Sequence, residues 1–288
     1  MIPDSVDLVL GANGYVGRHL VQHLKASGSQ VIASDIGASH ADEHERYLQV
    51  DLTDPESVAE LPMQVARIWM FAGRTGTWAG FDDPESFIRS NRNGLALLHA
   101  LCRVRRSQEL NAPPRIVFRS TRLIFNGSPF RPGEQAPQAA HTPYAQARRS
   151  CEAYLDMYAH CFGVPSTILR LYVPYGATLA AVLSFGTIGA MLAKAKRGEA
   201  LTLYGDGSQR RTFTHISDAV ADMAKVARMD AASGETINLG GGALQIGEVA
   251  RAIARKYCVV VEYVPWPEAE FQIEMATPFS THQKSILG

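Results

Sequence analysis

Short apolar runs alternate with amphipathic segments along the first two thirds of this 288-residue chain. The short runs predict buried β-strands, whereas apolar positions spaced three and four residues apart predict helices. Parallel strands need crossover connections, so this alternation predicts an α/β fold with a doubly wound parallel sheet. The predicted strands are residues 6–10, 31–34, 47–50, 66–71, 115–118 and 167–171.

Prolines mark the starts of three predicted helices. Asp54 is a candidate N-cap, followed by Pro55 at the first helical position. A second helix starts at Asp83-Pro84 and continues through leucines 95, 98 and 101, and a third, long helix opens at Thr142-Pro143.

A glycine-rich turn joins the first strand to an amphipathic helix. Gly11 permits the tight turn, Gly14 lets phosphates approach the backbone, and Gly17 lets helix and strand pack closely. Such a turn leaves backbone N–H groups at a helix N-terminus, where a pyrophosphate can bind. The second strand ends in Asp35, at the separation expected for an acid that binds an adenosine ribose and repels a 2′-phosphate. NAD is therefore favoured over NADP; the alternatives are an ordinary turn and a solvated Asp35.

Composition excludes several classes of protein. Lys and Arg balance Asp and Glu at 28 each, so nucleic acid is not an expected partner. The four cysteines show no paired spacing, which suits a reducing cytoplasm, and the N-terminus lacks signal-peptide features. Residues 171–193 are uncharged and long enough to span a bilayer, but Pro174 and several glycines favour a buried loop and helix. We expect a cytoplasmic protein that does not enter a membrane.

Further motifs carry a family resemblance. The Gly-x-x-Gly-x-x-Gly turn resembles the short-chain dehydrogenase/reductases, and later motifs resemble their extended branch, the NAD-dependent epimerase/dehydratase (nucleotide-sugar) family. These motifs are Ser120-Thr121 after the fifth strand, Tyr144-x-x-x-Arg148, and the stretch from Gly205 to Phe213. The chain departs from the family at four positions, where Asn126 replaces Gly, Arg148 replaces Lys, Val173 replaces Asn and Thr212 replaces Asp.

The resemblance implies a Rossmann fold with NAD across the carboxyl ends of the strands and a smaller C-terminal substrate-binding lobe. The expected NAD-binding unit is residues 1–172 with a returning segment at 212–242, and the lobe is mostly residues 173–288. The expected cofactor-binding residues are Gly11, Asn13, Gly14, Tyr15, Val16, Gly17, Asp35, Ile36, Asp51, Leu52, Phe71, Ala72, Gly73, Asn91, Tyr144, Arg148 and Leu171.

Three residues are expected to catalyse hydride transfer. Tyr144 acts as general base, Thr121 binds the reacting sugar oxygen, and Arg148 supplies the cation that the family takes from Lys. A free phenol has a pKa of about 10, so ionising it at neutral pH costs roughly 4 kcal/mol. A nearby cation can supply that free energy, although Arg for Lys is not a conservative change where geometry is tight.

The expected substrate is a nucleotide sugar, and the resemblance places Arg211 on its diphosphate. The expected substrate-binding residues are Arg74, Thr75, Arg122, Val173, Tyr204 and Arg211. Because Arg74 and Arg122 fall near the predicted pocket, we hypothesise that the sugar carries an acidic group. The resemblance also implies a homodimer through the helices that carry Asn91 and Tyr144.

Several reactions of the family are compatible with this sequence. A dehydratase of the family would place Asp-Glu after Thr121, where this chain has Arg122-Leu123, so dehydration is disfavoured. We expect a nucleotide-sugar 4-epimerase; the alternatives are a dehydrogenase or reductase of the same family and a catalytically lapsed NAD-binding protein. The histidine pairs 19/23 and 40/44 have a spacing that could bind metal, but solvated histidines are favoured and no metal is predicted.

Overall fold

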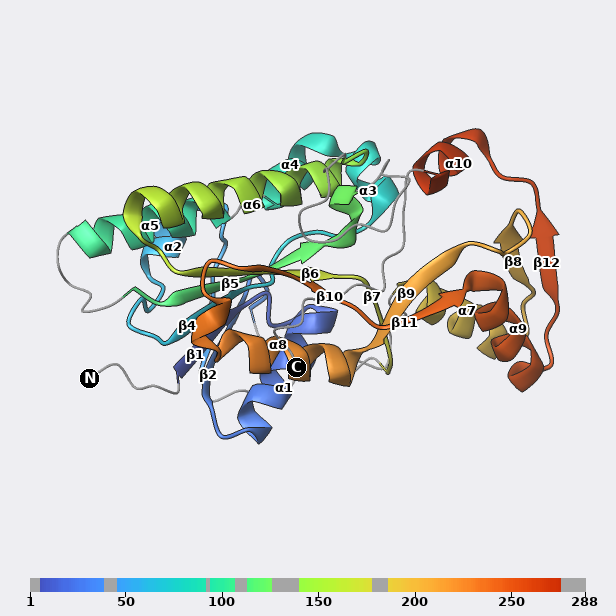
Figure 1. Ribbon diagram of the computed structural model, residues 1–288, viewed down its shortest axis with the longest axis horizontal. Coiled ribbons are helices and arrows are strands. Elements are labelled where there is room, and N and C mark those ends of the chain that lie inside the picture. Colours follow the sequence, from blue (N-terminus) through green and yellow to red (C-terminus); the bar gives the residue numbers. More distant parts are fainter. Residues whose placement is uncertain are drawn as a thin grey trace.

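The computed structural model describes residues 6–38, 46–91, 94–106, 113–125, 140–177 and 186–275. Its centre is a seven-stranded sheet in the order β10-β6-β5-β4-β1-β2-β3, in which every neighbouring pair is parallel (Figure 1). The strands are β1 (Val6–Leu10), β2 (Gln30–Asp35), β3 (Tyr47–Gln49), β4 (Arg67–Met70), β5 (Arg115–Thr121), β6 (Ser166–Leu171) and β10 (Thr236–Leu239). The doubly wound parallel sheet is confirmed, and each of the six strands predicted from apolar runs is present.

Helices cover both faces of this sheet, as crossover connections require (Figure 1). Helices α1 (Tyr15–Ala26) and α8 (Ile216–Ala227) pack on one face, where Leu20 and Val220 share a core with Val9. Helices α2 (Pro55–Ala59), α5 (Gly94–Arg106) and α6 (Pro143–Phe162) pack on the other, where Leu98 shares a core with Leu8. Val9 and Leu8 lie in the cores on opposite faces of the sheet, because successive side chains of a strand point to opposite faces.

Local sequence signals account for the helix starts. The Asp54 side chain accepts from the backbone N–H groups of Glu56 and Ser57 at the start of α2. The Thr142 side chain accepts from the N–H of Ala145 at the start of α6, and each helix has proline in its first turn. The helix predicted from Asp83 is present as α4 (Pro84–Asn91) and α5, with residues 92–93 outside the described part of the chain; α3 (Thr77–Asp82) precedes them.

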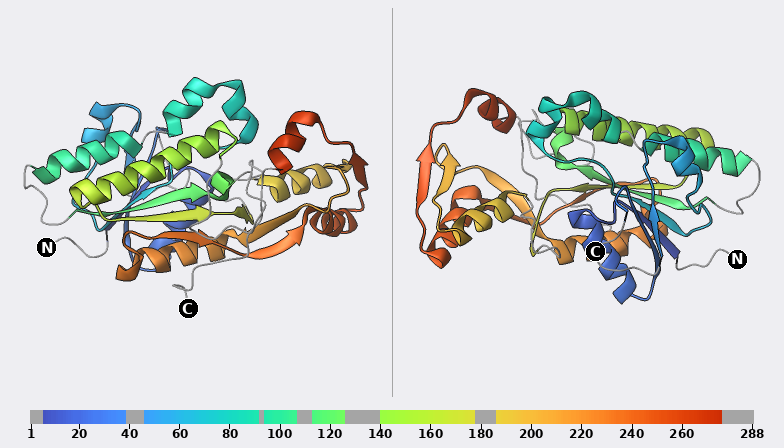
Figure 2. Two further views of the ribbon diagram at one scale, coloured as in Figure 1. Left: turned by 45° about the horizontal axis from the view of Figure 1, so that its top comes forward. Right: turned by 180° about the vertical axis from the view of Figure 1, so that it is seen from behind.

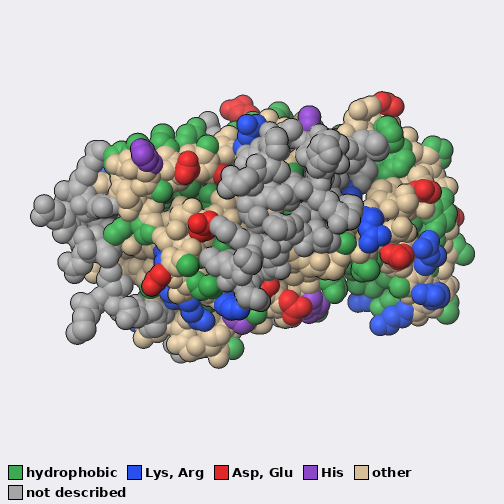
Figure 3. Space-filling model, in the orientation of Figure 1, with side chains coloured by type: hydrophobic (Ala, Val, Ile, Leu, Met, Phe, Trp, Pro, Cys, Tyr) green, Lys and Arg blue, Asp and Glu red, His purple; other side chains and the backbone are tan. Residues whose placement is uncertain are grey.

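A smaller lobe lies beyond the carboxyl ends of the central strands (Figure 2). It contains a three-stranded sheet of β7 (Val173–Tyr175), β9 (Arg210–His215) and β11 (Gly242–Gln245), and a two-stranded sheet of β8 (Leu201–Tyr204) and β12 (Val261–Val264). Its helices are α7 (Gly186–Lys196), α9 (Ile246–Tyr257) and α10 (Glu268–Met275). Two short 3₁₀ segments, η1 (Arg122–Phe125) and η2 (Asp230–Ala232), follow β5 and α8 respectively. Acidic and basic side chains are mixed over the visible part of the molecular face in Figure 3.

The uncharged stretch at residues 171–193 does not form one continuous helix. It contains the end of β6, then β7, and the first residues of α7, with residues 178–185 outside the described part of the chain. Among the described residues, no helix has both the length and the apolar character that crossing a membrane requires.

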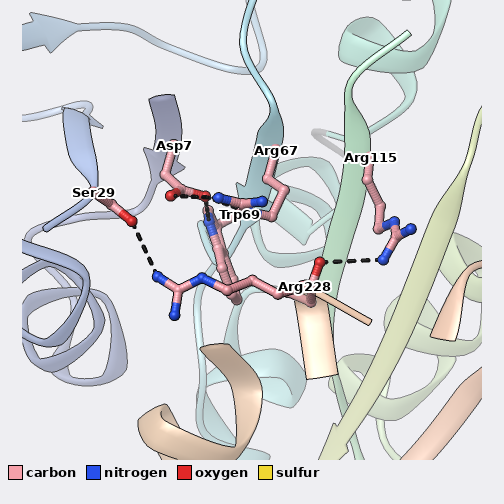
Figure 4. A network of polar contacts seen from close by, with 7 residues as sticks. Asp7, Ser29, Arg67, Trp69, Arg115 and Arg228 are labelled. Carbon is pink, nitrogen blue, oxygen red and sulfur yellow. Dashed lines mark hydrogen bonds and ion pairs between the residues drawn. The ribbon is translucent and has the colours of Figure 1, made fainter. Parts of the chain in front are cut away.

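A polar network closes the amino-terminal edge of the sheet (Figure 4). The fully buried Asp7 carboxylate accepts from Arg67 through Nε at 2.6 Å and Nη2 at 3.0 Å, and from the Trp69 indole N–H at 2.8 Å. Arg115 Nη1 donates to the carbonyl oxygens of Ala227, the last residue of α8, and Met229 at 3.2 and 2.6 Å. The Asp7 contacts therefore join β1 to β4, and Arg115 joins β5 to the end of α8.

Candidate functional site

The glycine-rich turn after β1 has the geometry that the sequence predicts. Gly11 has a φ of +86°, and a Cβ there would lie 2.5 Å from the backbone N of Ala72. A Cβ on Gly17 would lie 2.1 Å from the carbonyl oxygen of Gly11, so neither position admits a side chain. Gly14 is the N-cap of α1, whose first turn has no acidic residue and no side-chain cap. The first N–H groups of α1 thus form a cradle suited to an anion.

Asp35 is held in place at the carboxyl end of β2. Its Oδ2 accepts from the backbone N–H of Asn13 at 2.9 Å, and its Oδ1 accepts from that of Ile36 at 2.8 Å. The Asn13 side chain in turn donates to the Tyr47 hydroxyl at 3.2 Å. These contacts fix the carboxylate beside the glycine turn, where a ribose diol would lie in a dinucleotide site.

A cleft of about 520 Å³ follows the carboxyl ends of β1, β2 and β4. It brings together most of the residues predicted to hold the cofactor: Gly11, Asn13, Gly14, Asp35, Ile36, Asp51, Leu52, Phe71, Ala72 and Gly73. Its apolar walls suit an adenine, the N–H groups of the glycine turn suit a pyrophosphate, and the Asp35 carboxylate suits a ribose. The residues present therefore fit the adenosine half of NAD.

Other predicted cofactor residues lie outside this lining. Val16 and Leu171 are in the core, and Gly17 packs against the turn. The Tyr15 hydroxyl donates to the Gly176 carbonyl oxygen at 3.4 Å, and burial raises the pKa of this phenol to about 12. Asn91 ends α4, and its side chain is not described.

Tyr144 lies in the first turn of α6 with 6% of its surface exposed. Arg148 follows one turn later and is fully buried. Its guanidinium carbon lies 5.4 Å from the ring centroids of both Tyr144 and Phe118. Its Nη2 donates to the carbonyl oxygen of Ala72 at 3.2 Å. Because Ala72 lines the cleft, Arg148 joins the tyrosine to the dinucleotide site.

Arg119 is a residue of this site that the sequence analysis did not identify. It comes from β5, is 7% exposed, and its charge acts on the phenol of Tyr144. Burial by itself would raise the pKa of Tyr144, but the charges and hydrogen bonds of Arg119 and Arg148 outweigh it, so the pKa falls below its ordinary value. An arginine directly after the apolar positions 116–118, and directly before Ser120-Thr121, was the available signal.

Thr121 ends β5, two residues after Arg119. It is 6% exposed, and its hydroxyl oxygen accepts from the backbone N–H of Leu123 at 3.3 Å, at the start of η1. Helix α6 packs against both β5 and η1, so Thr121 and Tyr144 come from adjoining elements at the same edge of the sheet.

A buried ion pair fastens α6 to the two strands beneath it. Glu152 accepts from Arg170 of β6 at 2.7 and 3.1 Å and from the hydroxyl of Ser120, next to Thr121. The Arg170 guanidinium also lies 4.9 Å from the Phe125 ring centroid. Sequence reasoning missed this contact; Glu152, on the same helix face as Arg148, was the available signal. The pair fixes the position of the helix that carries Tyr144.

A second cavity of about 290 Å³ lies between η1 and the smaller lobe. It brings together three residues predicted to bind substrate: Arg122, Tyr204 and Arg211. Burial and the charge of Arg122 lower the pKa of Arg211 to about 9, and burial lowers that of Arg122 to about 10. Both remain cations at neutral pH, which suits an anionic group such as a diphosphate. Trp266, not identified from the sequence, lies at this cavity with its ring centroid 5.2 Å from that of Tyr204 and the two ring planes tilted by 42°.

The remaining predicted substrate residues lie elsewhere. Arg74 lines the first cleft and contacts Asp83 at 3.3 Å and Ser86 at 3.0 Å. Arg74 and Arg122 therefore line different cavities. Thr75 is exposed, and Val173 is half-buried in β7; neither is among the residues that line the two cavities.

The histidine pairs give no metal centre within the described residues. His19 Nε2 lies 2.9 Å from the carbonyl oxygen of Ala177, and no group of three or more ligating side chains occurs there. His40 and His44 lie outside the described residues, as do Asn126 and residues 276–288.

Comparison with known proteins gives concordant results. The model of the NAD dependent epimerase/dehydratase family matches residues 8–240. An uncharacterized UDP-glucose epimerase of Bacillus subtilis, YtcB, is 26% identical over 81% of this chain and 76% of its own length. A UDP-N-acetyl-alpha-D-glucosaminuronate decarboxylase of Bacillus cytotoxicus is 27% identical over 85% of this chain and 78% of its own. The UDP-glucose 4-epimerase of Thermus thermophilus, solved with NAD, is 25% identical, with a TM-score of 0.77 over 91% of this chain and 86% of that one.

Proposed function

Because this chain belongs to the NAD-dependent epimerase/dehydratase family, we propose that it is a nucleotide-sugar 4-epimerase that uses NAD. One observation carries the proposal. Tyr144 is buried with the Arg148 guanidinium carbon 5.4 Å from its ring centroid, and Arg148 also donates to the carbonyl oxygen of Ala72 in the lining of the dinucleotide cleft. A phenol in this environment is suited to general base catalysis next to a bound dinucleotide.

The chain's own residues account for cofactor binding. The N–H groups of the glycine turn would hold the pyrophosphate, Asp35 would accept from the adenosine ribose, and Leu52 and Phe71 would contact the adenine. When bound, NAD supplies the hydride acceptor and donor for carbon 4 of the sugar. The identity of Asp35 favours NAD over NADP because a carboxylate repels a 2′-phosphate.

In the proposed reaction Tyr144 takes the proton of the sugar 4-hydroxyl and later returns it. Thr121 donates a hydrogen bond to the same oxygen, and Arg148 stabilises the charged form of the base. Arg211 would hold the substrate diphosphate in the second cavity, and Tyr204 and Trp266 would contact its base. An epimerase reaction of this kind would leave carbon 4 with the opposite configuration.

Two residues favour epimerisation over dehydration. Arg122 and Leu123 follow Thr121, and neither can move the proton that water elimination requires. A dehydrogenase or reductase of the same family is the second candidate. A lapsed NAD-binding protein is the third; the placement of Arg148 between Tyr144 and the cleft argues against it.

We also propose that the sugar carries an acidic group. Arg122 lines the second cavity beside Arg211, which adds a cation beyond the one assigned to the diphosphate. The Bacillus cytotoxicus relative is described as acting on a glucosaminuronate, an acidic sugar. Turnover of UDP-glucuronate should exceed that of UDP-glucose, and equal turnover of neutral and acidic sugar nucleotides would contradict this part of the proposal.

The reaction can be identified with UDP-, GDP- and dTDP-linked sugars, by following epimer formation and the absorbance of NADH together. Epimer without accumulating NADH identifies a 4-epimerase. Net NADH formation identifies a dehydrogenase, whereas binding of NAD with no turnover of any sugar nucleotide identifies a lapsed enzyme. Tyr144→Phe is the matched control, because it removes the base and keeps the ring.

We further propose the division of the chain into an NAD-binding unit, residues 1–172 with 212–242, and a substrate-binding lobe in the rest of 173–288. The second cavity, between η1 and the lobe, supports it. A homodimer through α4 and α6 stays a prediction, and sedimentation equilibrium would test it.

A further inference from the structure

Arg74 brings a positive charge to the dinucleotide cleft. Among the described residues that line this cleft, Arg74 is the one with a cationic side chain, whereas Asp35 and Asp51 contribute carboxylates. A pyrophosphate adds further negative charge, and the first N–H groups of α1 offer it partial positive charges only. A full positive charge at this cleft would therefore stabilise a bound dinucleotide.

The order of the strands places Arg74 on the nicotinamide side of the glycine turn. Asp35 ends β2, the turn follows β1, and Arg74 follows β4, and these strands are neighbours in the order β2-β1-β4. The turn and the segment after β4 are close, because a Cβ on Gly11 would lie 2.5 Å from the backbone N of Ala72. With the adenosine ribose at Asp35 and the pyrophosphate at the turn, the nicotinamide half extends toward β4.

Contacts with α4 hold the Arg74 guanidinium at the wall of the cleft. Its Nη1 donates to Asp83 Oδ2 at 3.3 Å and to Ser86 Oγ at 3.0 Å. Ser90, one helical turn after Ser86, also lines the cleft. Among the described residues, both hydrogen bonds of this guanidinium come from Nη1, so Nη2 and Nε are available to a phosphate.

Phe87 orients the guanidinium. The guanidinium carbon of Arg74 lies 5.6 Å from the centroid of the Phe87 ring. Phe87 is fully buried and packs edge-on against Tyr144, with the ring centroids 6.2 Å apart and an angle of 82° between the planes. A planar cation that already lies over a fixed ring loses less conformational freedom when it binds an anion.

The ion pair between Arg74 and Asp83 is exposed. The Arg74 side chain is 45% exposed and that of Asp83 is 52% exposed. Ion pairs of this kind contribute little to stability, so Arg74 can exchange the carboxylate for a phosphate at small cost.

We propose that Arg74 binds the cofactor and not the sugar: its guanidinium forms an ion pair with the pyrophosphate of NAD and adds a full charge to the N–H groups of the glycine turn. Guanidinium and phosphate groups are well matched for such a pair. The proposal moves Arg74 from the substrate, where the sequence analysis placed it, to the cofactor. It depends on NAD binding and not on the reaction proposed above.

Calorimetric titration with adenosine, ADP-ribose and NAD tests the proposal. In Arg74→Met the affinities for NAD and ADP-ribose should both fall about tenfold, the low end for a charge-assisted hydrogen bond because the arginine is partly exposed. The affinity for adenosine, which has no phosphate, should be unchanged. Arg74→Lys, which keeps the charge without the planar group, should lose less.

Asp83→Asn is the matched control. It removes the carboxylate that pairs with Arg74, while asparagine can still accept from the Ser86 backbone N–H at the start of α4. Because Arg74 is then released, the affinity for NAD should stay the same or rise. An equal loss in Asp83→Asn and Arg74→Met would show that their ion pair acts structurally, which overturns the proposal.

The other outcomes also decide the matter. Unchanged affinity for NAD in Arg74→Met overturns the proposal, and loss of UDP-glucuronate binding in that case would return Arg74 to the substrate. A loss for NAD without one for ADP-ribose would place Arg74 on the nicotinamide, and an equal loss for adenosine would indicate a distorted cleft; each overturns it. None of these measurements requires turnover, so the proposal and the assigned reaction can fail independently.

Discussion

The two ends of the central sheet use arginine in opposite ways. At the amino edge, Arg67 pairs with the buried Asp7 carboxylate, and Arg115 donates to two backbone carbonyls. At the carboxyl edge, Arg119 and Arg148 are buried, and their charges act on the phenol of Tyr144. No carboxylate of the described residues forms an ion pair with either arginine. Arg115 and Arg119 lie on the same strand and are the same type of residue. They differ in their surroundings, which are backbone carbonyls for Arg115 and the Tyr144 phenol for Arg119.

The difference has a physical meaning. A buried arginine whose charge is balanced by a carboxylate or carbonyls contributes to holding the fold together. A buried arginine facing another cation destabilises the folded state unless an anion is formed or bound there. Such a conflict is common at functional sites, where activity and stability compete. Substitutions at the two edges should therefore have separable effects on stability and activity.

Tyr144→Phe should have the largest effect, at the carboxyl edge. Loss of the general base should reduce turnover about 10²- to 10⁴-fold, with the fold and NAD binding retained. Epimer formation measures the loss, and NAD titration checks that the cofactor site is intact. A reduction below about tenfold would show that another group is the base.

Asp7→Ala should have the largest effect at the amino edge, and on stability. It leaves the Arg67 guanidinium and the Trp69 indole N–H without their buried acceptor. The free energy of unfolding should fall by about 3–5 kcal/mol, the range for breaking one side of a buried ion pair. Denaturant titration measures it. The pH at which Tyr144 ionises, followed by the absorbance of tyrosinate, should not change. A shift would show that the two edges of the sheet are coupled.

Asp35→Ala should weaken NAD binding by about ten- to a hundredfold, because a carboxylate that accepts from the ribose is lost. The affinity for NADP should fall less, since the repulsion of a 2′-phosphate is lost as well. Calorimetric titration with both dinucleotides gives the ratio. An equal loss for NAD and NADP would contradict the role assigned to Asp35.

Arg148→Lys should have the smallest effect. It restores the family motif and keeps a cation near Tyr144, but it gives up the stacking on Phe118 and shortens the reach to Ala72. We expect turnover within about tenfold of the parent, whereas Arg148→Met, without a charge, should lose more. Parallel kinetics of the two variants measure the contrast; equal losses would show that the charge is not what matters.

The pH dependence of turnover should follow from the lowered pKa of Tyr144. The base must be deprotonated, so activity should rise with pH through this pKa, at a pH below the ordinary value of a phenol. Arg119→Met should move the rise to higher pH, because the guanidinium that favours the phenolate is gone. Rate profiles across pH for the two proteins check the sign.

Some parts of the molecule depend on local signals and were predictable from the order of residues. Short apolar runs and amphipathic spacing set the strands and helices, and Asp54 and Thr142 mark helix starts through short-range hydrogen bonds. The positive φ of Gly11 and the crowding at Gly17 follow from a turn whose residues are neighbours in the chain. Most of the dinucleotide cleft was predictable because parallel strands end at one edge.

Which distant side chains come into contact depends on how the helices and strands pack together. Arg119 and Tyr144 are 25 positions apart, and Trp266 reaches Tyr204 from a separate segment of the lobe. Arg74 and Arg122, grouped together from the sequence, line different cavities. Sequence periodicity fixes the face on which a side chain starts. The place where a long side chain ends, and the charge it meets there, depend on how the layers pack.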